Sequence, residues 1–342
     1  MGKISAFLKR KNVLFSAKRY GIDAMGAMAQ GLFASLLIGT IIKTLGQQLN
    51  VQFLIDAGNF AQQVAGPAMA VSIGAALSAP QLVLYSLIAV GMAANKLGGA
   101  GGPLAVYFIT IVASECGKIV SKETKVDILV TPAVTILVGV GLSVLCAPAI
   151  GAAASSVGDF IKWATNLQPL LMGILVSVVV GMALTLPISS AAICAALSLT
   201  GLAGGAAVAG CCAQMVGFAV MSFRENRTSM LQMPNIIRNP RVWIPPTLAS
   251  AITGPIATCL FHLEMNGPAV SSGMGTCGLV GQIGVYTGWL NDIAAGTKTA
   301  ILPMDWVGLI LICFVLPAVL TLLFAFFLRK WGWIKGGDLK LQ

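Results

Sequence analysis

The chain has 342 residues, of which 57% are hydrophobic and only 9% are charged, and its mean hydropathy is +0.90. Soluble domains carry about 25% charged residues, so a chain this apolar cannot cover its surface with water-compatible groups, and lipid must surround much of it. The net charge of +10 would suggest nucleic acid in a soluble protein. Here the basic residues lie in clusters between apolar runs, which is typical of membrane topology, so no nucleic-acid partner is expected.

A membrane-spanning helix needs roughly 20 mostly apolar residues, so the chain can hold about ten such segments with short connections. We therefore predict an all-α, polytopic transmembrane protein whose partner along most of its length is the lipid bilayer. One or two of the membrane segments are expected to be re-entrant hairpins.

The N-terminal residues 1–22 are basic and have the periodicity of an amphipathic helix on the inner membrane surface. No long apolar run precedes Gly21, so we expect no cleavable signal peptide.

Basic residues form four clusters, and these predict the orientation of the chain. If all four are cytoplasmic, an even number of crossings separates each neighbouring pair, and both termini lie on the cytoplasmic side of the bacterial cell membrane. The clusters are Lys3 to Arg19, then Lys118/Lys122/Lys125, then Arg224/Arg227/Arg238/Arg241, then Arg329/Lys330/Lys335/Lys340.

The first membrane block is predicted over 23–128, with a long helix at 24–45 and a polar surface stretch at 46–63. Three apolar segments follow at 65–79, 81–95 and 102–117. Glu115 and Lys118 stand three residues apart, a spacing that lets them pair on one helix.

The second block, 129–243, repeats this order. It is expected to hold a helix at 129–149, a surface helix around 155–167, and segments at 169–186, 187–201 and 203–222. The segment 187–201 is short for a spanning helix and begins with Pro187, which suggests a second re-entrant element. The likeness of the two blocks indicates an internal duplication, or equally a chance similarity between apolar sequences.

The third block, 244–328, holds a Gly-rich stretch at 265–285. An even number of crossings between the third and fourth basic clusters requires this stretch to enter and leave the membrane on the same side, as a re-entrant hairpin. An outer loop is expected at 286–304, with Asp292 and Lys298. Residues 329–342 are predicted to be a cytoplasmic tail.

Polar side chains inside a membrane are costly, and those in block three are the first candidates for a solute site. The alternative is that the hydroxyls bond only to helix carbonyls and that Glu264 is an exposed acid at the outer rim, beside His262. The candidates are Glu264, Asn266, Ser271, Ser272, Thr276 and Gln282.

Catalytic machinery is not visible in the sequence. There is no Ser/His/Asp set, no paired intramembrane carboxylates and no Cys/His metal spacing, so no enzyme, cofactor or metal is expected. The basic loop 224–241 is either a docking surface for a cytoplasmic partner or a set of charges that fixes topology.

Three stretches resemble the membrane IIC component of the bacterial sugar phosphotransferase system, especially its short stand-alone, perfringolysin O regulator-like branch. They are SMLQMPNIIRNPRVWIPPTLASAITGPI (229–256), GPAVSSGMGTCGLVGQIG (267–284) and GGPLAVYFITIVASECGKIVSKETKVDILVTPAVTILVG (101–139). The resemblance implies the fold, a homodimer and a cavity near the membrane midplane.

Glucose-type members of that system have a tight motif ending in a sugar-contacting glutamate, and a histidine in the first hairpin. This chain has Gly254 where the acid would fall, and Ser189 and Ser190 without a histidine in the hairpin. Ser189 and Ser190 therefore join the candidate solute residues, while coupling of transport to phosphorylation is not implied.

These observations predict a permease that binds a small polar, sugar-like solute and moves it by an elevator-type shift. The alternative is a membrane sensor that binds a solute and signals through the loop 224–241 without transport.

Overall fold

The computed structural model describes residues 3–186, 188–223 and 232–340, and the elements in these ranges are helices. Within them, the only β-type pairing is an isolated antiparallel bridge between Gly201 and Met265. The chain divides into two compact units, residues 1–154 and 155–342. The division falls inside one long helix, and each unit is described by itself.

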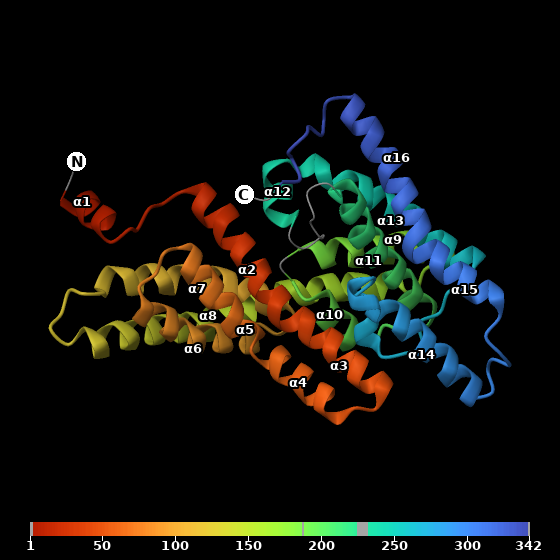
Figure 1. Cartoon of the computed structure of the whole chain (residues 1–342), viewed down its shortest axis with the longest axis horizontal. Coiled ribbons are helices and arrows are strands. Elements are labelled where there is room, and N and C mark those ends of the chain that lie inside the picture. Colours follow the sequence, from red (N-terminus) through yellow and green to blue (C-terminus); the bar gives the residue numbers. More distant parts are fainter. Residues whose placement is uncertain (1–2, 187, 224–231, 341–342) are drawn as a thin grey trace. The chain divides into compact units, whose positions relative to one another are not determined.

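The first unit begins with the short helix α1 (Lys3–Arg10), so the amphipathic helix predicted over 1–22 is shorter than expected. Figure 1 shows the helices that follow in red to yellow. They are η1 (Arg19–Asp23), α2 (Ala24–Leu32), η2 (Phe33–Leu37), α3 (Ile38–Leu49), α4 (Gln52–Gln63), α5 (Ala65–Ala76), α6 (Gln81–Gly98), η3 (Gly99–Gly101), α7 (Gly102–Val120) and most of α8 (Asp127–Ala164).

Glycines let the helices of this unit approach closely. A side chain at Gly66 would overlap the backbone of Gly91, which brings α5 against α6. Gly117 faces Val83, so α7 folds back along α6 from the turn at Gly99, whose φ of 51° favours glycine.

Lys118 ties the N-terminal segment to the helices of the first unit. Its ammonium group, on a residue only 2% exposed, pairs with Glu115 at 2.8 Å, which confirms the predicted spacing. It also donates to the carbonyl oxygen of Asn12 at 2.8 Å and to that of Leu77, at the end of α5, at 3.1 Å. A cation at a helix C-terminus satisfies a carbonyl that has no partner within the helix.

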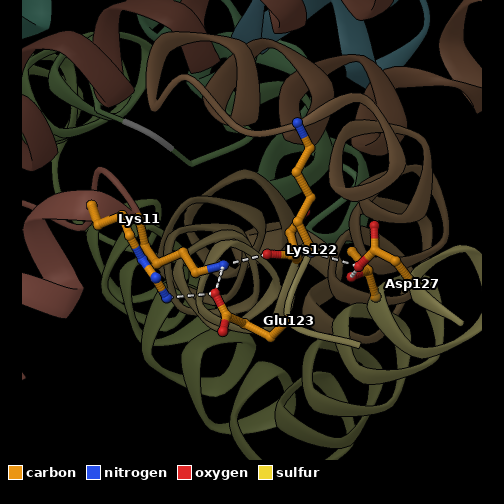
Figure 2. Close-up of polar contacts among 7 residues, drawn as sticks. Lys11, Lys122, Glu123 and Asp127 are labelled. Atoms are coloured by element: carbon orange, nitrogen blue, oxygen red, sulfur yellow. Dashed lines mark hydrogen bonds and ion pairs between the residues drawn. The ribbon is translucent and has the colours of Figure 1, made fainter. Parts of the chain in front are cut away.

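The loop between α7 and α8 also binds the N-terminal segment, through ion pairs and a hydrogen bond. Figure 2 shows Lys11 reaching Glu123 and the nearby backbone, where it donates to the carbonyl oxygen of Ser121. Arg10 pairs with Glu123 at 2.7 Å. Asp127 shapes the loop by accepting from the backbone N–H of Lys122 at 2.7 Å.

The second unit holds the end of α8 and the remaining helices, green to blue in Figure 1. They are α9 (Pro169–Thr185), α10 (Ser190–Ala196), α11 (Gly201–Met221), α12 (Met233–Arg238), η6 (Pro240–Trp243), α13 (Ile244–Pro255), η7 (Ile256–Leu260), η8 (Ala269–Gly273), η9 (Cys277–Leu279), α14 (Val280–Ala294), α15 (Pro303–Ile310), η10 (Leu311–Val315) and α16 (Leu316–Lys330).

Five helical stretches of the described residues are long and apolar enough to cross a membrane: 19–49, 81–120, 127–164, 201–221 and 303–330. The all-helical membrane class predicted from composition is thereby confirmed. The expected total of about ten segments, the re-entrant hairpins and the duplication remain predictions, as do the block boundaries.

Two local expectations were wrong. The surface helix expected around 155–167 is not separate, because α8 runs unbroken from Asp127 to Ala164. Pro148 lies inside α8, and the alanine-rich stretch after it favours helix. The outer loop expected at 286–304 is partly helical, since α14 continues to Ala294.

Candidate functional site

The extended segment 263–267 positions the candidate site in the second unit. Met265 pairs with Gly201 through two backbone hydrogen bonds, which holds residues 263–267 beside the start of α11. A side chain at Gly205 of α11 would overlap the carbonyl oxygen of Leu263, and one at Gly288 of α14 would crowd the backbone of Asn266. Glycines on both helices therefore make room for this segment.

Asn266 is the centre of the hydrogen bonds in the site. Its side-chain oxygen accepts from the backbone N–H of Gly201 at 3.1 Å, which fixes the orientation of the amide. Its amide nitrogen then donates to Glu264 Oε2 at 3.0 Å and to Asp292 Oδ1 and Oδ2 at 3.1 and 3.0 Å. One neutral amide thus holds two carboxylates side by side.

The opposite wall comes from the loop after α14 and from the start of α15. Lys298 pairs with Asp305 at 2.7 Å, and its ammonium group lies 5.5 Å from the centre of the Trp289 ring. Asp305 also accepts from the backbone N–H of Leu302 at 2.7 Å, which caps α15. Trp289 is buried and packs edge-on against Trp306, with ring centres 5.3 Å apart.

These walls enclose a cavity of about 380 Å³, which we call the acidic pocket. The volume falls within the range of small-molecule sites, about 300–1,000 Å³. Its lining carries three carboxylates and one ammonium group, from Glu264, Asp292, Asp305 and Lys298. The excess of acceptor oxygens suits a ligand that donates hydrogen bonds and disfavours an anion.

Two of the eight predicted solute residues, Glu264 and Asn266, line the acidic pocket. Ser190 and Ser272 serve elsewhere, because Ser190 donates to the carbonyl oxygen of Gly273 at 2.8 Å and Ser272 to that of Leu199 at 2.5 Å. These two bonds hold the segment around α10 against η8.

The other four predicted residues also lie outside the lining of the acidic pocket. Gln282 is buried and donates to the Cys212 sulfur at 3.2 Å, while its carbonyl oxygen has no hydrogen-bond partner among the described residues. Ser271 is buried, and Ser189 and Thr276 are half-buried.

Sequence reasoning missed Trp289 and Asp305, and it placed Asp292 and Lys298 in a loop. Val285, Trp289 and Asp292 are four and three residues apart, which places them on one face of a helix. A helix predicted through this stretch would have placed Asp292 on the same face as the apolar Val285 and Trp289.

Within the described part of the chain, no group of three or more His, Cys, Asp or Glu side chains is arranged to hold a metal ion. The acidic pocket offers hydrogen-bonding groups, which are the carboxylate oxygens and the Lys298 ammonium group.

The family model described as "Phosphotransferase system, EIIC" covers residues 22–341, nearly the whole chain. No curated protein and no solved structure matches the chain.

Proposed function

Because the chain belongs to the EIIC family of the phosphotransferase system, whose members are membrane components for sugar transport, we propose that it binds a small sugar-like solute in the acidic pocket. The solute would then be carried across the bacterial cytoplasmic membrane. The observation that supports this site is the Asn266 amide, which holds Glu264 and Asp292 together at the cavity wall.

The chemistry of the pocket suits a polyol. Sugar hydroxyls are hydrogen-bond donors, and charged acceptors form stronger hydrogen bonds than neutral ones. Trp289 offers an aromatic surface for the less polar side of a ring, and Lys298 offers a donor for a hydroxyl oxygen. Since Asn266 uses its own donors to hold the carboxylates, their remaining lone pairs are free to accept from the solute.

An elevator-type movement remains our proposal for the transport step. Near the pocket the second unit has irregular backbone, with the short α10 and the 3-10 turns η8 and η9. Irregular backbone at membrane depth is tolerated only where protein or a cavity surrounds it. We propose that the stretch 265–285 and the segment around α10 form the hairpins of the moving part and that the protein works as a homodimer.

The alternative of a sensor that signals through the loop 224–241 gains no support from the family match. Residues 224–231 of that loop lie outside the described residues. EIIC components work with the other proteins of their phosphotransferase system, so the soluble partners we propose are of that class.

Thermal unfolding of the purified protein against sugars, polyols, sugar phosphates and nucleosides tests the proposed ligand class. A ligand at about 100 times its dissociation constant stabilises the folded state by roughly 2.7 kcal/mol. We expect a neutral sugar to raise the unfolding temperature and its phosphate ester to have no effect, because the pocket carries excess negative charge.

The location of the site is tested by Asp292→Asn, which should remove both the thermal shift and uptake of the same sugar into vesicles. Asp159→Asn is the matched control, because this carboxylate is exposed and lies outside the lining of the pocket. Full uptake by the Asp292→Asn protein would show that the solute binds elsewhere.

A further inference from the structure

The last apolar stretch of the chain ends at α16, and if this stretch crosses the membrane, the end of α16 lies near the lipid headgroups. Residues 303–330 are long and apolar enough to cross a membrane. Along α16 a row of large apolar side chains is exposed: Val319, Leu322, Leu323, Phe326 and Phe327. Such a row is stable against lipid but not against water.

Basic and aromatic side chains follow at once where α16 ends. Arg329 and Lys330 occupy its last turn, and Trp331 and Trp333 come next, 65% and 42% exposed. Tryptophan concentrates at the membrane–water interface, and basic residues there contact the headgroups.

A second cavity, of about 820 Å³, lies at this end of α16, and we call it the tail cavity. Its lining includes Met221, Phe223, Arg329, Gly332, Lys335 and Gly336. Arg329 and Lys335 are its only charged lining residues within the described part of the chain. The cavity thus has an apolar side and a basic side.

The segment after α16, within the predicted tail 329–342, packs against the helices of the second unit. Ile334 and Leu339 are buried in a core with Phe218 and Val242. Asn239 donates to Asp338 at 2.8 Å and to the carbonyl oxygen of Trp333 at 3.1 Å. These contacts hold Lys335 on the same cavity as Arg329.

Neither cation of the tail cavity is neutralised by an acid in the described part of the chain, where the ion pairs lie elsewhere. Arg329 donates one hydrogen bond, to the carbonyl oxygen of Met221 at 3.2 Å, and a guanidinium group has five N–H donors. Asp338 is the nearest acid in sequence, and it accepts from Asn239 and from the backbone N–H of Lys335. Among the described residues, the two cations therefore lack an acidic partner and can bind an anion.

We propose that the tail cavity binds the phosphate of an anionic phospholipid, with Arg329 and Lys335 as its donors. The depth set by α16, the exposed tryptophans and the apolar side of the cavity favour a lipid over a free anion. Because basic clusters mark the cytoplasmic face, the lipid would belong to the inner leaflet. This inference does not depend on the acidic pocket, which lies beside α15 at the other end of the stretch 303–330.

Lipid titration of the purified full-length protein in detergent tests the proposal, with the thermal unfolding midpoint as the readout. Short-chain phosphatidylglycerol is compared with phosphatidylcholine and with inorganic phosphate. We expect phosphatidylglycerol alone to raise the midpoint. The variant Arg329→Gln/Lys335→Gln should need on the order of ten-fold more of this lipid for the same rise.

Lys330→Gln is the matched control, because it removes one exposed charge beside Arg329 but outside the cavity lining. It should behave like the unmodified protein. If the double variant fails to fold, Lys335→Gln alone provides the test, since Lys335 is an exposed residue outside the described helices.

Three outcomes would overturn the proposal. An equal loss in Lys330→Gln would indicate diffuse surface attraction without a site. Equal stabilisation by inorganic phosphate would assign the cavity to a free anion. Equal stabilisation by phosphatidylcholine would show that the net negative charge of the lipid is not needed for binding.

Discussion

The amide nitrogen of Asn266 lies 3.1 and 3.0 Å from the two carboxylate oxygens of Asp292, which is 26 residues further along the chain. This contact joins the segment 263–267 to α14 and closes one wall of the acidic pocket.

Asn266→Asp should weaken solute binding about ten-fold or more at neutral pH, because it replaces a hydrogen-bond donor by a fourth carboxylate in the acidic pocket. Asn291→Asp is the control, since this neighbour is exposed and makes only a 3.4 Å bond to the Asn266 carbonyl oxygen. Calorimetric titration with the sugar found in the thermal screen provides the measurement. Equal losses in the two variants would contradict a specific role for the Asn266 amide.

Lys118→Met should lower the free energy of unfolding by about 3–5 kcal/mol, because Glu115 would then be a buried charge without its partner. Thermal unfolding in detergent provides the measurement, with Lys125→Met, an exposed lysine of the next loop, as the control. The double variant Lys118→Met/Glu115→Gln should recover part of the loss, since it removes the unpaired charge. Absence of any recovery would argue against the ion pair as the cause.

Glu123 should make the stability of the first unit depend on pH. Its pKa lies below the usual range, first because Lys11 donates a hydrogen bond to it and further because Arg10 is near. Because the carboxyl pKa is lower in the folded state, the ionised Glu123 stabilises the folded protein fully above the ordinary glutamate pKa, about 4.3. This stabilisation is lost as the pH falls through the lowered pKa.

The measurement for Glu123 is the unfolding midpoint of the unmodified protein and of Glu123→Gln between pH 7 and pH 3. The difference between the two proteins should be constant near neutral pH and shrink below about pH 4.3. It should also shrink at high salt, because these charges are partly exposed. A difference that persists at low pH would show that Glu123 acts without its charge.

Gly205→Ala should destabilise the second unit by about 3 kcal/mol or more, because the new Cβ would overlap the carbonyl oxygen of Leu263 in a packed region. Gly141→Ala in α8 is the control, since open space surrounds that position and alanine favours helix. Thermal unfolding and the yield of folded protein report the effect. Normal stability of the Gly205→Ala protein would contradict the close approach of the segment 263–267 to α11.

Composition and charge were sufficient to predict the helical membrane class, because few charges and long apolar runs leave no other stable arrangement. The Glu115–Lys118 pair was also predictable, since it depends on spacing within one helix. The contacts of Lys118 with Asn12 and Leu77 were not, because they join segments 106 and 41 residues apart.

Glu264 and Asn266 stood out in the sequence as polar residues in an apolar block. Asp292 did not, because residues 286–304 were expected to be an outer loop, whereas α14 continues to Ala294. The hydroxyls of Ser190 and Ser272 looked equally suited to a solute, but only the folded backbone shows that carbonyl oxygens already accept from them.

The bond from Lys118 to Asn12 also sets an order for the synthesis of the first unit. Lys118 leaves the ribosome 106 residues after Asn12, and chains grow at about 5–20 residues per second. For about 5 to 20 seconds the carbonyl oxygen of Asn12 therefore lacks its contact with Lys118, while the residues between them are made. Translation speed thus sets how long the N-terminal segment waits for this contact.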